Sequence, residues 1–154
     1  MTDPSQTGPG FIIVTHGEIG SALLAVARYI LGRELAHFTA VSVPFMGGLA
    51  EVIPPGSPAP FAQRQQLIAE RIQAARAVVD TGGGVVVLTD VLGGTSFTTA
   101  RGLLGPEQGV VAGVNLPMVL KAAELQGLTP AEAAAQLVER SRRAIVASPG
   151  QGQA

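Results

Sequence analysis

The sequence predicts an α/β fold in which a mostly parallel sheet is covered by helices on both faces. Short apolar runs alternate along the chain with segments in which apolar residues recur at helical spacing, and this alternation is typical of parallel sheets. One run, Val85–Leu88, is apolar at every position, as expected for a central strand that is buried on both faces. The chain has 154 residues, which is enough for one domain with a single core.

Five strands and five helices are predicted in the order β-α-β-α-β-α-β-α-α-β. The strands are expected at residues 11–15, 37–43, 85–88, 109–114 and 144–147. The helices are expected at residues 19–31 and 61–80, from Thr95, after Asn115 and after Thr129. This order predicts a mostly parallel sheet, and we expect the flavodoxin-like strand order 2-1-3-4.

Glycine and proline divide the first half of the chain. From Ile19, apolar residues recur at helical spacing, and Gly32 is positioned to end this helix because glycine readily adopts the left-handed conformation of many C-caps. Residues 44–60 contain five prolines and predict a loop without regular structure. This loop is most simply a tolerated surface insertion, with a lid or a partner-contacting segment as the alternative.

Capping residues mark two helices in the second half. Asn115 is expected to cap the helix that contains Pro117 in its first turn. Thr129 is followed three residues later by Glu132, and this spacing approximates a capping box.

The composition argues against several classes of function. Ten basic residues against eleven acidic ones leave the net charge near zero, with no basic stripe, so no nucleic-acid partner is expected. The chain has no cysteine and only two histidines, which argues against disulfides, thiolate chemistry and a histidine-rich metal site. We expect neither a cofactor nor a bound metal.

The chain shows no sign of a targeting or membrane segment. Residues 1–10 are polar and rich in glycine and proline, unlike a signal peptide. No apolar run approaches the ~20 residues needed to cross a bilayer. We therefore expect a cytoplasmic protein without membrane insertion, with flexible segments at residues 1–10 and 148–154.

His16 ends the first predicted strand, and Asp90 follows the third. Open parallel sheets carry their reacting groups at the carboxyl ends of strands. If strands 1 and 3 are neighbours, the carboxylate can hold one imidazole nitrogen and leave the other free to react. A histidine in this position can be a base, a metal ligand or a covalent nucleophile. The shortage of further ligand residues argues against the metal ligand.

The segment Gly93-Gly94-Thr95-Ser96 predicts an anion site beside this pair. Two glycines allow close approach of the backbone, and the helix N-terminus after them offers unpaired amides and a favourable dipole to an anion. The candidate phosphate-binding residues are Thr15, Gly93, Gly94, Thr95 and Ser96. Together with the histidine and the aspartate, they favour a nucleophile that accepts a phosphoryl group.

Each of these features has an ordinary structural explanation when it stands alone. An aspartate before a helix often only forms a turn, and a single histidine is more often structural than catalytic. Their joint occurrence at two strand ends favours the functional interpretation. The sequence has no Walker A loop, no G-x-S-x-G elbow and no complete dinucleotide fingerprint. His37 is expected at the opposite end of the sheet, without a catalytic role.

With these residues, the chain resembles the EIIA proteins of the mannose class of the bacterial phosphoenolpyruvate:sugar phosphotransferase system. Three segments carry the resemblance: Ile12–Gly17, Val87–Phe97 and Ala112–Met118. The second is similar to the Asp-x-x-Gly-Gly-Ser/Thr-Pro pattern of the family. The likeness extends over residues 11–147, which would form a single EIIA domain.

The resemblance implies a phosphocarrier. His16 would accept a phosphoryl group from phospho-HPr and pass it to an EIIB protein in sugar uptake. Asp90 would orient the imidazole, and Thr95 with the backbone of Gly93 and Gly94 would bind the phosphoryl oxygens. The resemblance also implies a homodimer, in which the C-terminal strand lies antiparallel at a sheet edge and can be exchanged between protomers.

The chain departs from the family pattern at the entry to the third helix. Ser96 replaces the usual proline, and Thr98 stands where asparagine is common. The 44–60 loop is also longer and richer in proline than expected. One alternative is a regulatory EIIA whose phosphorylation state controls binding to a kinase, transporter or transcription factor. Another is a receiver-like or anion-binding module of the same sheet topology; the lack of an acidic cluster at the first strand argues against a receiver.

Overall fold

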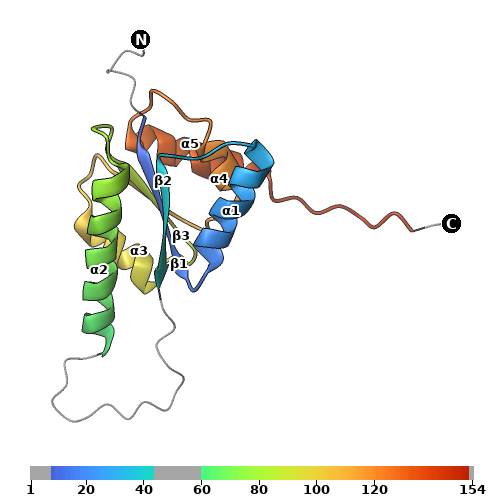
Figure 1. Cartoon of the computed structure of the whole chain (residues 1–154). Coiled ribbons are helices and arrows are strands. Elements are labelled where there is room, and N and C mark those ends of the chain that lie inside the picture. Colours follow the sequence, from blue (N-terminus) through green and yellow to red (C-terminus); the bar gives the residue numbers. More distant parts are fainter. Residues whose placement is uncertain (1–7, 44–59, 153–154) are drawn as a thin grey trace.

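Figure 1 shows a parallel sheet between two layers of helices, in a computed structural model that describes residues 8–43 and 60–152. The strands are β1 (Gly10–His16), β2 (Phe38–Val43), β3 (Val85–Thr89) and β4 (Gly109–Ala112). The helices are α1 (Ile19–Leu31), α2 (Pro60–Val79), α3 (Thr95–Leu103), α4 (Leu116–Ala122) and α5 (Pro130–Arg143). The strand order is β2-β1-β3-β4 and each neighbouring pair is parallel, which confirms the predicted α/β fold and strand order.

Alternation along β1 divides the core between the two faces of the sheet. Phe11 and Ile13 belong to the cluster formed with α1, α4 and α5. Ile12 and Val14 belong to the cluster formed with α2 and α3 on the other face. Because burial of one large apolar side chain contributes about 1.5–3 kcal/mol, these clusters hold β1 rigidly up to its last residue, His16.

The predicted helix caps are present. Asn115 accepts a hydrogen bond of 2.9 Å from the backbone N–H of Met118 at the start of α4. Thr129 and Glu132 form a capping box at the start of α5. Gly32 ends α1 with a φ of 62°, a conformation that glycine adopts without the steric cost of a side chain.

Within the single chain, the predicted C-terminal strand over residues 144–147 does not form. α5 continues to Arg143, and the residues after it extend away from the sheet without regular structure (Figure 1). Ile145 and Val146 are 74% and 80% exposed. A β-prone run becomes a strand only beside the free backbone groups of another strand, and this segment extends from the end of α5 away from the rest of the molecule.

Two further differences lie at the ends of strands. β1 already begins at Gly10, within the segment expected to be flexible, while residues 1–7 lie outside the described part of the chain. β4 ends at Ala112, earlier than predicted, because Gly113 turns the backbone with a φ of 85°.

The predicted 44–60 loop lies outside the described residues, apart from Pro60, at which α2 begins. None of the helices in the described part combines the length and the apolar character that crossing a membrane requires.

Candidate functional site

The sheet brings His16 and Asp90 to the same edge. His16 is the last residue of β1, and Asp90 directly follows β3. β1 and β3 are parallel neighbours in which Val14 pairs with Thr89, so Asp90, the residue after Thr89, follows at the level of Thr15, next to His16. The predicted adjacency of the histidine and the aspartate is therefore correct.

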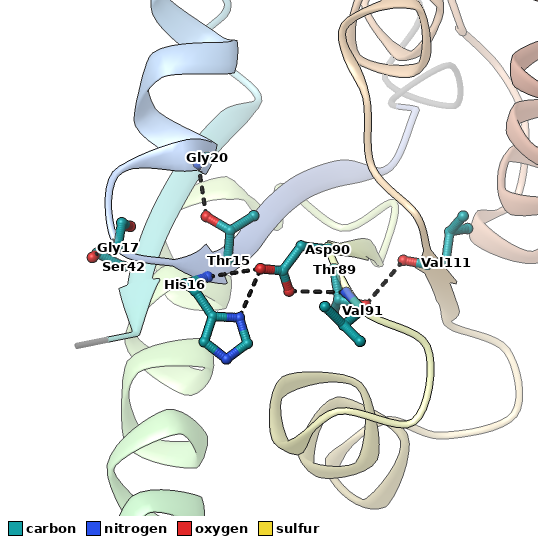
Figure 2. A network of polar contacts seen from close by, with 9 residues as sticks. All are labelled: Thr15, His16, Gly17, Gly20, Ser42, Thr89, Asp90, Val91 and Val111. Carbon is teal, nitrogen blue, oxygen red and sulfur yellow. Dashed lines mark hydrogen bonds and ion pairs between the residues drawn. The ribbon is translucent and has the colours of Figure 1, made fainter. Parts of the chain in front are cut away.

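One carboxylate oxygen of Asp90 holds both the ring and the backbone of His16 (Figure 2). Oδ2 lies 2.8 Å from Nδ1 of the imidazole and accepts a 2.9 Å hydrogen bond from the His16 backbone N–H. The second oxygen, Oδ1, accepts a 3.0 Å bond from the backbone N–H of Val91. The side chains of His16 and Asp90 are 32% and 14% exposed, so the pair is shielded but reachable.

This contact determines which ring nitrogen of His16 can react. An ionised carboxylate only accepts hydrogen bonds, so Nδ1 must carry the proton that is shared with Asp90. Nε2 lies on the far side of the ring from the carboxylate in Figure 2 and makes no hydrogen bond to the described residues. A neutral imidazole in this tautomer presents the lone pair of Nε2 as a nucleophile.

The environment of Asp90 favours the ionised carboxylate. Partial burial acts to raise the pKa of Asp90, but the hydrogen bonds from the backbone and ring of His16, together with the positive charge that the ring can carry, outweigh it. The pKa of Asp90 is therefore below its ordinary value, and the group remains a proton acceptor for Nδ1 at neutral pH.

The start of α3 differs from the starts of α4 and α5. No side chain caps α3 at Gly94, and the first helical bond that its carbonyl accepts comes from the N–H of Thr98. The turn before it depends on Gly93, which has a φ of 73°, and on the bond from the Gly94 N–H to the Val91 carbonyl. The first amides of α3 thus stay available to an anion, in the loop that carries Asp90.

The predicted phosphate-binding side chains differ in their positions. Thr95 is half-buried in the first turn of α3. The hydroxyl group of Ser96 is buried and has no hydrogen-bond partner within the described structure. Thr15 is fully buried, and its Oγ1 accepts a 2.7 Å bond from the Gly20 N–H at the start of α1.

Thr15 therefore does not bring its hydroxyl group to the histidine. Neighbouring residues of a strand point to opposite faces, so Thr15 lies on the α1 side and His16 on the α2 and α3 side. Gly20 permits this contact, since a Cβ there would lie 3.0 Å from the Thr15 hydroxyl oxygen. The hydroxyl of Thr15 links the start of α1 to the end of β1 and so stabilises the strand end that carries His16.

Sequence reasoning missed Ser42, whose Oγ donates a 2.7 Å hydrogen bond to the carbonyl of Gly17. The contact depends on the register between β1 and β2, in which Thr15 pairs with Ser42. No local motif signals this register. His37, by contrast, precedes β2 at the opposite end of the sheet, as predicted.

The site joins a histidine, a carboxylate that contacts its Nδ1, and the helix N-terminus that follows in the same loop. Within residues 8–43 and 60–152, no group of three or more His, Asp or Glu side chains is arranged to hold a metal ion. The combination suits attack by Nε2 on an electrophile whose negative charge the first amides of α3 can stabilise.

A family model described as "PTS system fructose IIA component" (EIIA-man) matches residues 59–142 of the chain. This range includes Asp90 and the Gly93–Gly94 turn, and it begins after His16. The match extends over more than half of the chain, which therefore belongs to this family of phosphotransferase-system components.

Similar proteins agree with this assignment. The "PTS system mannose-specific EIIAB component" of Escherichia coli (strain K12) is 28% identical over 140 residues, which cover 88% of this chain and 38% of the relative. The chain thus spans less than half the length of this curated relative. The same figures hold for the protein of that description from Shigella flexneri.

Solved structures resemble the chain over most of its length. The mannose/sorbose-specific IIA subunit of Enterococcus faecalis has a TM-score of 0.70 and 27% identity, covering 96% of this chain and all of the other. The phosphotransferase component EIIA of Streptococcus agalactiae has a TM-score of 0.62 and 20% identity, with 90% and 95% coverage. At that identity, the second likeness concerns the fold alone.

The lowered pKa of Asp90 predicts a pH-dependent contribution to stability. The contribution is present above the unfolded-state pKa of about 3.9 and is lost as the pH falls through the lower folded-state value. We expect Asp90→Asn to reduce the free energy of unfolding at about pH 6, and the difference from wild type to shrink toward about pH 3. Urea unfolding of both proteins between about pH 3 and pH 6 measures this difference in the free energy of unfolding. A difference that stays constant over this range would contradict the prediction.

Proposed function

We propose that the chain is a phosphocarrier that accepts a phosphoryl group on Nε2 of His16 from phospho-HPr and passes it to an EIIB protein during sugar uptake. The observation that carries the proposal is the 2.8 Å contact between Nδ1 and Asp90, which leaves Nε2 as the reactive nitrogen. Membership of the phosphotransferase-system family supports phospho-HPr as the donor and an EIIB protein as the acceptor.

In the proposed step, the lone pair of Nε2 attacks phosphorus while the P–N bond of the donor phosphohistidine breaks. The electron pair of that bond returns to the donor imidazole, and the proton on Nδ1 stays in its hydrogen bond to Asp90. As positive charge develops on the His16 ring, the carboxylate stabilises it. Transfer to the acceptor reverses these movements.

The start of α3 is proposed to hold the phosphoryl oxygens. Asp90 is negatively charged, so a phosphoryl group on the neighbouring ring needs compensating positive potential. The uncapped amides after Gly94 and the dipole of α3 supply it, with the hydroxyl group of Thr95 as a further donor. Catalysis of phosphoryl transfer rests largely on such positioning and charge stabilisation.

The proposal includes the extent of the domain and its assembly into a homodimer. Residues 11–147 act as one EIIA domain in the cytoplasm. We also propose a homodimer in which residues 144–147 add to a sheet edge of the partner. Its support is the exposure of Ile145 and Val146 and the position of β4 at an edge of the sheet.

Phosphorylation in vitro tests the carrier function. With phosphoenolpyruvate, enzyme I and HPr, wild type should gain an acid-labile, base-stable phosphate, and His16→Ala should gain none because it lacks the nucleophile. His37→Ala is the matched control and should be labelled like wild type. Labelling of His16→Ala, or none of wild type when HPr is phosphorylated, would refute the proposal.

Replacing the carboxylate tests the role of Asp90. Asp90→Asn keeps the size of the side chain but removes the charge that stabilises the ring, so transfer should slow by roughly 100-fold. Rapid-quench measurement of phosphoryl transfer from phospho-HPr gives the rate. An unchanged rate would remove Asp90 from the mechanism.

The acceptor decides between transport and regulation. Phosphorylated protein should lose its label to an EIIB protein of the mannose class when the two are mixed. If the label stays on His16 while a kinase, transporter or transcription factor binds only one phosphorylation state, the regulatory alternative holds instead.

The proposed dimer is tested by sedimentation of the full chain. Wild type should sediment as a dimer, and Ile145→Asp combined with Val146→Asp should dissociate it, because charges cannot be buried in an added strand without a partner. Val78→Asp, on an exposed position of α2, is the control. A wild-type monomer at micromolar concentration would contradict the dimer.

A further inference from the structure

The backbone that follows His16 is bound to β2 at two successive peptide groups. The Gly17 N–H, which belongs to the peptide bond after His16, donates a 3.0 Å bond to the carbonyl of Val43. The Gly17 carbonyl, in the next peptide group, accepts the 2.7 Å bond from Ser42 Oγ. Figure 2 shows Ser42 beside Gly17, on the side of His16 away from Asp90.

These bonds complete the restraint on His16. The peptide group before His16 is held by Asp90 through the His16 N–H, and the one after it by β2. These bonds therefore oppose rotation about both backbone bonds of His16, with Asp90 holding one side and β2 the other. Because the backbone is held on both sides, these contacts also fix the direction of the Cα–Cβ bond of His16, along which the imidazole leaves the backbone.

Gly17 is the weak point of this arrangement, because it has a φ of 51° and glycine has the widest conformational freedom of any residue. The carbonyl of Gly17 could rotate at little steric cost if nothing held it. Ser42 supplies the only side-chain hydrogen bond to that carbonyl among the described residues. Arg71 of α2 in turn donates to the carbonyl of Ser42, at the outer edge of the sheet.

We propose that Ser42 is a positioning residue for phosphoryl transfer, and that it acts on His16 through Gly17. This inference rests on the proposed function of His16. Ser42 holds the Gly17 carbonyl, so that Nδ1 stays in line with Asp90 and Nε2 keeps a single direction of attack. Arg71 supports it by fixing the backbone of β2 at that point.

Substitution at Ser42 should change the transfer step and leave donor binding intact. For Ser42→Ala we expect kcat for transfer from phospho-HPr to fall about tenfold, with KM within about twofold of wild type, because misalignment affects the reacting atoms alone. Ser42→Thr retains the hydroxyl group and should restore the rate, whereas the similarly shaped Ser42→Val should not. Thr39→Val, which removes a hydroxyl group elsewhere on β2, is the matched control and should behave as wild type.

A second measurement follows the imidazole without any phosphoryl donor. Nitrogen-15 NMR of His16 should show the Nδ1–H tautomer in wild type, in Ser42→Thr and in Thr39→Val. Its population should fall in Ser42→Ala and Ser42→Val. Retention of the wild-type tautomer population and rate in both variants would overturn the proposal, as would an equal loss in Ser42→Thr. If wild type shows the tautomer but accepts no phosphoryl group, the proposed function fails while the positioning role stands.

Discussion

The hydrogen bond between His16 and Asp90 is the interaction on which the rest of the site depends. A single carboxylate oxygen receives both the ring N–H and the backbone N–H of the histidine, and the other oxygen receives the N–H of Val91. One side chain therefore joins the end of β1 to the loop after β3. The Asp90 carboxylate occupies Nδ1 of His16 and so leaves Nε2 free, and its bond to Val91 positions the turn that leads into α3.

If Nε2 of His16 accepts a phosphoryl group as proposed, the negative charge of Asp90 beside it requires compensating positive potential, which the start of α3 can supply. Side chains cap α4 and α5 at Asn115 and Thr129, whereas α3 begins at Gly94 without such a cap. The first backbone amides of α3 are therefore available to an anion, and the positive φ of Gly93 allows the tight turn that leads into the helix. The helix that follows Asp90 in the chain thus begins without the side-chain cap that α4 and α5 have, a property that it shares with α1.

Much of the fold could be predicted from local sequence, because strands, caps and glycine stops carry short-range signals. The run Val85–Leu88 and the caps at Asn115 and Thr129 are examples. The absence of a strand at residues 144–147 within the single chain has the same origin, since β propensity shows that a segment can pair but not whether a sheet edge is within reach. In this chain, α5 carries that segment away from the sheet.

The sequence by itself predicted the histidine, its carboxylate partner and the glycine turn, because residue type and the end of an apolar run identify them. Only the tertiary structure decided which side chains meet. The strand alternation that turns His16 toward α2 and α3 turns Thr15 toward α1, so adjacency in sequence does not mean a shared site. The contact of Ser42 with Gly17 likewise follows from the register of β1 against β2. Register arises from packing across the whole sheet, and no short segment encodes it.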